Sequence, residues 1–446
     1  MSPHPPVRLP RALSFGLLSA CLALGAPSAH GLTTDARRLG MGQTHMSGGR
    51  ELSGLNVAYQ SMPSRRGAGG LVIPIPLGLV QLATDFPSLD PEDADFSVTR
   101  LANLALNPPF FLELTEPSDL NGDISIYVAR NEFSILFEDA QELLPQKPLE
   151  VGSVWTTPMI GLNVMGARAY ASPVVFLEGE VAFDDAFYGV LAQGEPLLPN
   201  STYRFDAGGE SMAGMSFNFG YSAPVDVDAR GNGLYAGAYV KYLMGFTMGK
   251  ADTRFTMSTS DTIFGSSNPL DVGYEATVRY ASFGRIGNGL GLDIGAAYRT
   301  GNIDFGIGLR DLASSIHWSR TQVERAWLDE ATNEIVTETV ETDTEYTQKI
   351  PMQTTFNVSW RGTRTILAAD ITTSSLSTNL HLGAERQVGP VAVRGGLLTD
   401  DDASLQVSWG FGFGLSSLWF DLGFQTHNRS FTGERGVTLG TSIALR

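Results

Sequence analysis

Ten residues near the end of the chain, the segment from Leu405 to Gly414 (LQVSWGFGFG), alternate strictly between two kinds of side chain. The odd positions are large and apolar, and the even positions are small or polar. Because successive side chains of a β-strand point to opposite faces, this segment predicts a strand with one apolar and one polar face. A half-buried strand of a soluble sandwich has the same pattern. The two alternatives differ in how often the pattern recurs along the chain.

The same alternation recurs through most of the chain after Val154. Apolar residues occupy every second position in rows such as Met215 to Tyr221, Leu234 to Met248, Leu290 to Tyr298 and Leu418 to Phe424. About fourteen such strands can be counted, and an even number is usual for single-chain membrane barrels. The sequence therefore predicts an all-β fold, a transmembrane antiparallel β-barrel whose apolar face meets lipid.

Turn lengths agree with this prediction. Short turns near Gly301, Gly362, Gly389 and Ser416 fall at one end of the strands, and the long connection 314–351 falls at the other. If the C-terminus is periplasmic, the short turns are periplasmic and the long connection is external. Outer-membrane barrels have this asymmetry, and a soluble sandwich has no reason to obey it.

The composition suits a barrel wall better than a soluble domain. Charged residues make up 17% of the chain, whereas a soluble protein has about 25%. Without the first 31 residues the chain has 28 basic against 47 acidic residues, a net charge of −19. Nucleic acid is excluded as a partner, because phosphates require a basic face.

The first 31 residues predict a cleavable signal peptide. Arg8 and Arg11 form a basic start, Leu13 to Leu24 an apolar run, and Ala29 to Gly31 a cleavage site with small residues. A lipoprotein signal ending at Cys21 is the alternative. The expected location is the outer membrane of a Gram-negative bacterium, where the barrel-assembly machinery and lipid are the expected partners. No feature indicates an oligomeric state.

Three regions are therefore expected: the signal peptide 1–31, a mixed N-terminal region 32–153 and the barrel 154–446. The mixed region packs inside or beneath the barrel, or forms a small periplasmic domain. The connection 314–351 is an acidic outer loop, or contains a hairpin that turns at 329–333. This acidic segment and Asp400 to Asp402 either bind cations or partners, or are solvated surface that charge keeps soluble.

The segment from Asp35 to Gly42 (DARRLGMG) resembles the start of mature proteins in the FadL-like superfamily of outer-membrane barrels, which includes fatty-acid and hydrocarbon transporters and TraF-like and PorV-like barrels. Those proteins have an Ala-Arg-x-x-Gly-Met-Gly-Gly-Ala-like segment and then Asn-Pro-Ala. This chain has Gln43-Thr44 in place of Gly-Ala, and 56–58 read NVA.

A second similarity covers the C-terminal part, roughly 350–446. It comprises Ile350-Pro351, a strand with Ala369-Asp370, the segment 382–385 (LGAE) and the segment 393–396 (VRGG). The chain ends in Arg446, where many members of the superfamily end in an aromatic residue.

The resemblance implies that the N-terminal segment folds into the lumen as a hatch, and that apolar ligands enter from outside and leave sideways or through a kink. The alternative is a tucked-in N-terminus that only seals the barrel. The glycines of this segment would let the backbone turn tightly inside the wall. The expected hatch residues are Leu39, Gly40, Met41, Gly42, Met46 and Asn56.

In a barrel with a hatch, the glycines of the 405–414 segment acquire a specific role. Gly410, Gly412 and Gly414 would face the lumen, and the hatch would pack closely against them. A bulky residue at Gly412 should then disturb the hatch rather than the wall.

Charged residues that alternate with the apolar rows are expected to face the lumen. We interpret them as cross-strand pairs that neutralise one another, and as ion-selectivity residues only as a second choice. The expected lumen-facing residues are Glu275, Arg279, Asp293, Arg299, Asp304, Arg310, Asp370, His381, Glu385, Arg394 and Asp421.

The sequence does not indicate an enzyme. None of the four histidines after residue 31 has a Ser or Asp at a spacing that singles out a catalytic triad, and His381 is interpreted as a charge-ladder partner of Glu385. The segment that begins at Asp119 resembles a calcium loop, but its twelfth position is Arg130 instead of Glu. We therefore predict no catalytic residue, no cofactor and no metal centre.

Two functions remain open. The first is an outer-membrane barrel that passes small hydrophobic compounds, with a fatty-acid-like ligand. The second is a barrel of the same build that transports nothing and serves as a structural or accessory component of a secretion or conjugation apparatus. An apolar pocket between hatch and wall would favour the first function, and a solidly packed plug would count against it.

Overall fold

The computed structural model describes residues 36–45, 56–63, 71–75, 111–113, 124–129, 132–137, 149–156, 160–164 and most of 167–445. Gaps lie at 262–269, 283, 330–331, 333, 376, 400–404, 416–417 and 428–435. The predicted signal peptide with Cys21, the hatch candidate Met46 and the acidic turn at Asp400 to Asp402 lie outside the described residues.

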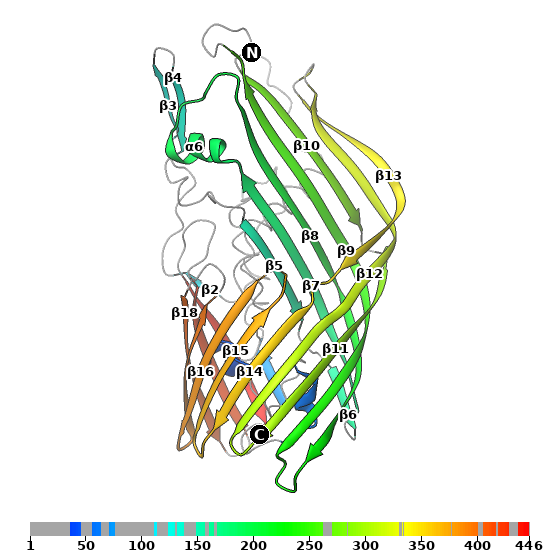
Figure 1. The fold of residues 1–446 in the computed structure, drawn as a ribbon, viewed down its shortest axis with the longest axis vertical. Coiled ribbons are helices and arrows are strands. Elements are labelled where there is room, and N and C mark those ends of the chain that lie inside the picture. The colour runs from blue at the N-terminus through cyan, green and yellow to red at the C-terminus, as the bar shows by residue number, and fades with distance from the viewer. Residues whose placement is uncertain are drawn as a thin grey trace.

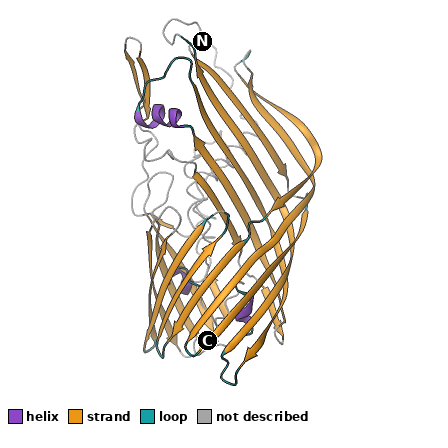
Figure 2. Cartoon of the chain, viewed as in Figure 1, coloured by secondary structure: helices purple, strands orange, loops and turns teal. Residues whose placement is uncertain are grey.

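Nearly all of the described chain is β-strand (Figure 2). The helical elements are α2 (Ala36–Leu39), the 3-10 helix η1 (Val57–Gln60) and α6 (Asp185–Gln193). The first strands are β1 (Leu71–Ile75), β2 (Phe111–Glu113), β3 (Ile124–Ala129), β4 (Glu132–Phe137), β5 (Leu149–Thr156), β6 (Ile160–Val164) and β7 (Ala167–Phe183).

The long strands follow, and the short ones come last. The long group is β8 (Thr202–Val227), β9 (Gly233–Thr259), β10 (Leu270–Ala281), β11 (Gly287–Thr300), β12 (Ile303–Asp329) and β13 (Glu334–Lys349). The short group is β14 (Gln353–Arg361), β15 (Thr365–Thr373), β16 (Thr378–Val388), β17 (Val391–Thr399), β18 (Leu405–Leu415), β19 (Leu418–His427) and β20 (Gly436–Leu445).

Eighteen of these strands form one antiparallel sheet, which wraps into a barrel (Figure 1). Four strand positions are shared by two successive segments: β10 and β11 both pair with β9, β13 and β14 with β12, β5 and β6 with β7, and β1 and β2 with β20. The wall therefore has fourteen strand positions, which confirms the predicted barrel of about fourteen strands. Strands from the predicted 32–153 region contribute to this wall.

The wall is much taller on one side than on the other (Figure 1). Strands β14 to β20 have 9 to 11 residues, the length at which a tilted strand crosses a bilayer, about 9–11 residues. Strands β8, β9 and β12 have 26, 27 and 27 residues and continue above this ring. We call the short ring the membrane ring and the upper parts of β7–β10, β12 and β13 the extension.

The outer face of the membrane ring is apolar. In β18 the odd residues are exposed and the even residues up to Gly412 are buried, so Phe411 is 48% exposed and Gln406 only 2%. Other large apolar side chains are exposed on neighbouring strands in the same way, including Phe305, Phe356, Leu367, Leu382, Val393 and Phe420. A continuous band of exposed apolar side chains on a wall that curves into a barrel is the lipid-facing surface of a transmembrane β-barrel.

The wall bends where the membrane ring meets the extension. The strand position of β10 and β11 is interrupted after Ala281, and that of β13 and β14 after Lys349. Between them, β12 has two non-glycine residues with positive φ, Asp311 at 55° and Ala313 at 53°. Register shifts between β11 and β12 lie at the same level.

Large apolar side chains meet on the inner face at this bend. Trp318 packs closely against Gly245 and Gly287: a Cβ on Gly245 would lie 2.5 Å from its ring, and one on Gly287 would lie 2.6 Å from it. We call the following group the apolar cluster: Val174, Phe176, Met212, Leu243, Met248, Ala281, Ile316, Trp318 and Ile350.

One local irregularity overrides the predicted alternation in β9. The β8–β9 register shifts between Ala213 and Gly214, which leaves one extra residue, Phe246, on β9. Met248 therefore faces inward in the apolar cluster, whereas the simple alternation from Leu234 places it on the outer face. The residues from Arg254 to Thr259 are the end of β9.

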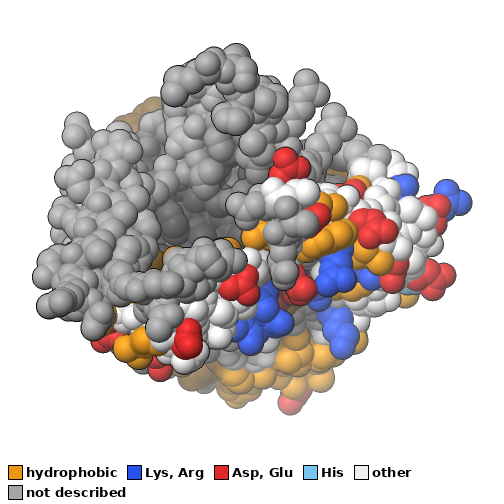
Figure 3. Space-filling model, turned by 90° about the horizontal axis from the view of Figure 1, so that it is seen from above, with side chains coloured by type: hydrophobic (Ala, Val, Ile, Leu, Met, Phe, Trp, Pro, Cys, Tyr) orange, Lys and Arg blue, Asp and Glu red, His pale blue; other side chains and the backbone are white. Residues whose placement is uncertain are grey.

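The acidic segment 314–351 is not a loop. It forms the upper half of β12 and all of β13, a hairpin whose strands end at Asp329 and begin again at Glu334. Seen from above, acidic and basic side chains are interspersed on the described part of this end (Figure 3).

Helix α6 packs against one face of the extension. Its N-cap is Asp184, whose carboxylate accepts the backbone N–H of Phe187 at 2.6 Å, and its C-cap is Gly194 with φ of 67°. Phe187 and Val190 pack on Tyr203. Among the described residues, no helix has the length and apolarity needed to span a membrane.

Candidate functional site

Two described pieces of the N-terminal region lie inside the membrane ring (Figure 1). The first, 36–45, contains α2 and packs on β18, β19 and β20; the second, 56–63, contains η1 and packs on β8, β9 and β11. We call them together the hatch. Leu39, Met41 and Asn56 are all buried, Met41 completely.

The first piece approaches the wall backbone to backbone, because glycines stand on both sides of the contact. Gly42 has φ of 66°, and a Cβ there would lie 2.7 Å from the carbonyl oxygens of Leu382 and Leu397. Gly40 faces Gly410 in the same way: a Cβ on Gly40 would lie 3.0 Å from the Cα of Gly410. A side chain at either glycine would require the hatch or the wall to shift, so this part of the hatch is solidly packed against the wall.

The other lumen-facing glycines of β18 have different neighbours from those expected. A Cβ on Gly412 would meet Asp421 Oδ1 at 2.5 Å and Arg394 Nη2 at 2.6 Å, and one on Gly414 would overlap the Trp419 indole. The expectation that a substitution at Gly412 acts on the hatch is therefore wrong. Gly412 makes room for an ion pair of the wall, because cross-strand side chains on one face lie side by side.

A chain of four charged side chains links the hatch to the wall. Arg37 of α2 donates two hydrogen bonds to the Glu385 carboxylate, both at 2.8 Å. Arg394 donates to the same carboxylate at 2.7 Å and to Asp421, also at 2.7 Å. These three wall residues come from β16, β17 and β19 and are buried. A buried charge requires a partner of opposite sign, so these pairs satisfy one another.

Neutral side chains of the second piece of the hatch, Asn56 and Tyr59, also bind the wall. The side chain of Asn56 caps η1 by accepting the N–H of Ala58 at 3.0 Å, and it donates to the carbonyl of Ala296 at 3.0 Å. Tyr59 donates its hydroxyl to Asn357 Oδ1 at 2.7 Å.

The other expected lumen residues of β11 and β12 pair within the wall. Arg299 contacts Asp304 at 2.7 Å and donates to the Pro63 carbonyl of the hatch at 2.8 Å. Lys241 lies between Asp293, at 2.7 Å, and Asp311, at 2.8 Å. The backbone N–H of Asp311 also donates to Asp293 at 2.8 Å, which holds the left-handed conformation at the bend.

Three expected lumen residues lie higher. Arg310, half-buried, donates to Gln353 at 3.4 Å. Glu275 and Arg279 lie in the extension, on the same face of β10 as Ala281 of the apolar cluster. Glu275 pairs with Arg325 at 3.2 Å, both largely exposed, and Arg279 donates to Thr321 and Thr344 at 2.9 Å.

A buried carboxyl group lies beside the apolar cluster in the extension. The Tyr346 hydroxyl donates to Glu210 Oε2 at 3.0 Å. Burial raises the pKa of Glu210 above its usual value, more than the Tyr346 hydrogen bond lowers it.

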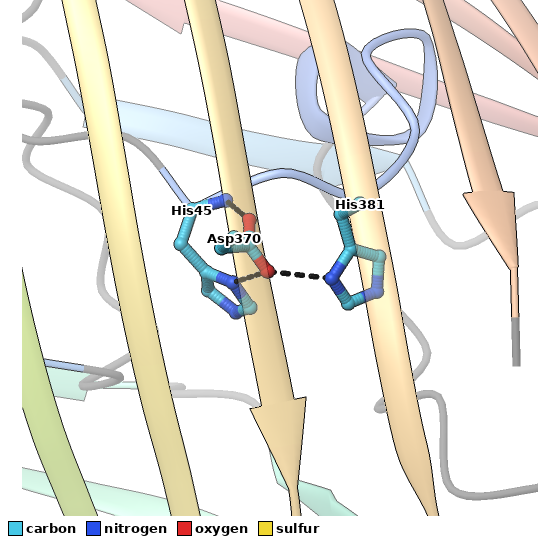
Figure 4. Close-up of side chains that lie close together, drawn as sticks. All are labelled: His45, Asp370 and His381. Atoms are coloured by element: carbon cyan, nitrogen blue, oxygen red, sulfur yellow. Dashed lines mark hydrogen bonds and ion pairs between the residues drawn. The ribbon is translucent and has the colours of Figure 1, made fainter. Parts of the chain in front are cut away.

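The last group joins the hatch to β15 and β16. His45 of the hatch, Asp370 and His381 point toward one another in the lumen (Figure 4). Both imidazole Nδ1 atoms approach Asp370 Oδ1, at 2.8 Å from His45 and 2.5 Å from His381. The expected ladder of His381 with Glu385 is therefore wrong: Asp370 lies opposite His381 in the β15–β16 register.

Three residues of this network were missed in the sequence. Arg37 and Lys241 are cations at positions that the alternation and the resemblance placed near the lumen, so their pairing could have been anticipated. Asp311 breaks the period of β12, and only its positive φ turns it toward Lys241.

The wall, its apolar outer band and the inward-folded hatch define a transmembrane β-barrel with a plugged lumen. The chain belongs to a family of unknown function, DUF5723, whose model matches residues 177–434, more than half of the chain. A search of curated proteins found no match.

Several solved structures of barrel proteins are similar at low identity. The Pseudomonas putida toluene transporter TodX is 11% identical over 95% of this chain and 98% of that chain, with a TM-score of 0.34. A second structure of the P. putida toluene transporter TodX is 12% identical over 72% of this chain and 85% of that chain, also at 0.34. A Rh. blastica porin mutant is 10% identical over 53% of this chain and 100% of that chain, with a TM-score of 0.20.

Proposed function

We propose that this protein is an outer-membrane β-barrel of a Gram-negative bacterium that passes small hydrophobic compounds, with the hatch as its gate. The observation that carries the proposal is the apolar cluster on the inner face, directly above the plugged membrane ring. This function also agrees with the FadL-like resemblance of the 35–42 segment.

A barrel for hydrophilic solutes needs a polar lumen. Here the inner face at the bend has Phe176, Met212, Met248 and Trp318 instead, from four different strands. Methionine and aromatic side chains can rearrange around apolar molecules of different shape. These four side chains have exposed fractions of 1–3%, so a hydrophobic compound that enters from the extension would reach them once the cluster opens.

The membrane ring below the cluster is closed in this conformation. Gly42 contacts the wall backbone on both sides, and Arg37 is anchored to Glu385. Passage therefore requires that the hatch move or that the compound leave through the wall, where β12 bends at Asp311 and Ala313. If passage requires the hatch to move, a covalent bond between the hatch and the wall should block passage.

The same close packing favours a second candidate, a barrel that transports nothing and serves as an accessory or structural component of a secretion or conjugation apparatus. A plug without room for a ligand suits this role as well. The two candidates differ in whether the hatch has to move.

The first test is uptake of hydrophobic compounds from several chemical classes by a deletion strain, with and without the restored gene. Unchanged uptake across all classes would rule out transport. Loss of a surface or secretion phenotype in the same strain would instead support the accessory role.

The second test locks the hatch. Met41 packs against Ala368 of β15, so the double variant Met41→Cys/Ala368→Cys places a removable disulfide between hatch and wall. Oxidation should stop uptake, and reduction should restore it. Each single-cysteine variant is the matched control and should transport under both conditions. Full uptake by the locked form would exclude the hatch as a gate.

A further inference from the structure

One buried carboxylate of the lumen differs from all the others that the structure describes. Asp304 has Arg299, Glu385 and Asp421 have Arg394, and Asp293 and Asp311 share Lys241. Asp370, with an exposed fraction of 3%, is the one whose ion-pair partners are histidines. Arg38, the nearby cation of α2, donates to the carbonyls of Gln43 and Thr44 instead.

The geometry around Asp370 is unusual for a simple hydrogen-bonded group. His45 Nδ1 lies 2.8 Å from Asp370 Oδ1 as an ion pair, and this buried nitrogen has no regular hydrogen-bond partner among the residues that the structure describes. The two imidazole rings are nearly perpendicular, at 79°. Three donor atoms from three separate segments thus converge on one point inside the barrel (Figure 4).

We propose that His45, Asp370 and His381 form a binding site for one divalent transition-metal ion of the Zn²⁺ or Fe²⁺ class. Two imidazole nitrogens and one carboxylate oxygen suit these ions and not Ca²⁺ or Mg²⁺, which prefer oxygen ligands. Metal–ligand bonds of about 2.0–2.2 Å place the donor atoms about 3.0–3.4 Å apart. The two nitrogen–oxygen separations, 2.8 and 2.5 Å, therefore need to widen by less than about 1 Å, and all three donor atoms already lie within 4.8 Å of one another.

The surroundings hold the three ligands in place. Asp370 and His381 are directly opposite on β15 and β16. Asp370 Oδ2 accepts the backbone N–H of His45 at 2.7 Å, and Asn357 Nδ2 donates to the His45 carbonyl at 3.4 Å. Such outer hydrogen bonds orient metal ligands. Because His45 belongs to the hatch and the other two to the wall, a bound ion ties the hatch to the wall, whether or not the hatch is a gate for transport.

The test is metal binding by the full-length barrel in detergent after treatment with a chelator. Zn²⁺ is titrated calorimetrically, and Co²⁺ is added as a probe whose visible absorption reports histidine and carboxylate ligands. Because the site is buried, each ion is supplied both to the folded barrel and during refolding from denaturant. We expect one ion per chain by at least one of these routes.

Three variants decide the assignment. His45→Ala, His381→Ala and Asp370→Asn should each weaken binding by more than about a hundredfold, since even outer-shell changes cost roughly 10- to 100-fold. Ser222→Ala is the control, because it removes a hatch–wall hydrogen bond to the Ala58 carbonyl and contacts neither the three ligands nor Asn357. It should bind the ion like the unaltered chain.

A second readout is the protection of the hatch. Bound metal should slow tryptic cleavage after Arg37 in the unaltered chain and in Ser222→Ala, but not in His381→Ala. If the unaltered chain takes up no ion by either route, or if the three ligand variants bind as well as it does, the proposal is wrong and the cluster is a structural histidine–carboxylate contact.

Discussion

Two neighbouring glycines of β17 allow a sharp test of the docked hatch. A Cβ on Gly396 would overlap the backbone of Met41 and the nitrogen of Gly42, and would lie 2.7 Å from the Gly42 Cα. A Cβ on Gly395, on the outer face, would meet only the Ser408 carbonyl at 4.0 Å. Gly396→Ala should therefore loosen the hatch, and Gly395→Ala should not.

The magnitude follows from comparing two responses of the protein. Overpacking costs about 1–3 kcal/mol when the neighbours shift. Complete expulsion of the hatch would expose Met41, at about 1.5–3 kcal/mol, and leave Glu385 without Arg37, at up to about 3–5 kcal/mol. The smaller cost decides the outcome, so the hatch should remain docked and open more often. A loss of 1–3 kcal/mol corresponds to roughly 5- to 150-fold more of the open form.

The assay is limited trypsin digestion in detergent, followed at Arg37 and Arg38 of α2. Cleavage of a transiently opened segment follows the population of the open form when closing is fast, so the rate in Gly396→Ala should rise roughly 5- to 150-fold. The heat-modifiable gel shift of the barrel should stay, because the β16–β17–β18 ladder is unchanged. Equal cleavage rates in the two alanine variants would refute the close backbone contact.

Three further changes probe other parts of the network. Arg394→Met leaves Glu385 and Asp421 buried without this partner, so it should lower the free energy of unfolding by about 3–5 kcal/mol, measured by urea denaturation in detergent; an unchanged midpoint would contradict the pairing. Tyr59→Phe removes one neutral hydrogen bond and should cost about 1 kcal/mol of hatch docking, seen as faster hydrogen exchange in 56–63, with no change expected at 36–45. The pKa of Glu210 is raised in the folded extension, so its contribution to stability is present below the unfolded pKa and is lost as pH rises through the folded pKa. Stability of the extension should fall as pH rises above the ordinary glutamate pKa of about 4.3 in the unaltered chain, and Glu210→Gln should remove that slope; an identical slope in both proteins would show that other groups cause it.

The strands of the membrane ring were predictable because their signal is local. Alternation in β18 follows from backbone geometry alone, which places Phe411 outside and Gly412 inside regardless of the rest of the chain. The same two-residue period places Asp293, Asp304 and Asp370 on the lumen face. The hatch was predicted from a motif resemblance, because residues 36–45 have no periodicity that indicates a position inside a barrel.

The alternation rule did not predict the irregular points of the backbone. The extra residue at Phe246 reverses the face of Met248, and the positive φ of Asp311 adds a carboxylate to Lys241. A one-residue shift in a strand moves every later side chain to the opposite face, so an alternation rule fails at each bulge.

Which charged side chains pair with one another depends on the tertiary structure, because the partners are far apart in the sequence. Arg37 and Glu385 are 348 residues apart in the sequence, and His45 and Asp370 are 325 residues apart. Whether His381 faces Asp370 or Glu385 depends on the register between β15 and β16, and whether Gly410 or Gly412 meets the hatch depends on where α2 comes to rest. A local sequence pattern determines the face on which a side chain lies. Its partner on that face is set by the free energy of many strands closing together.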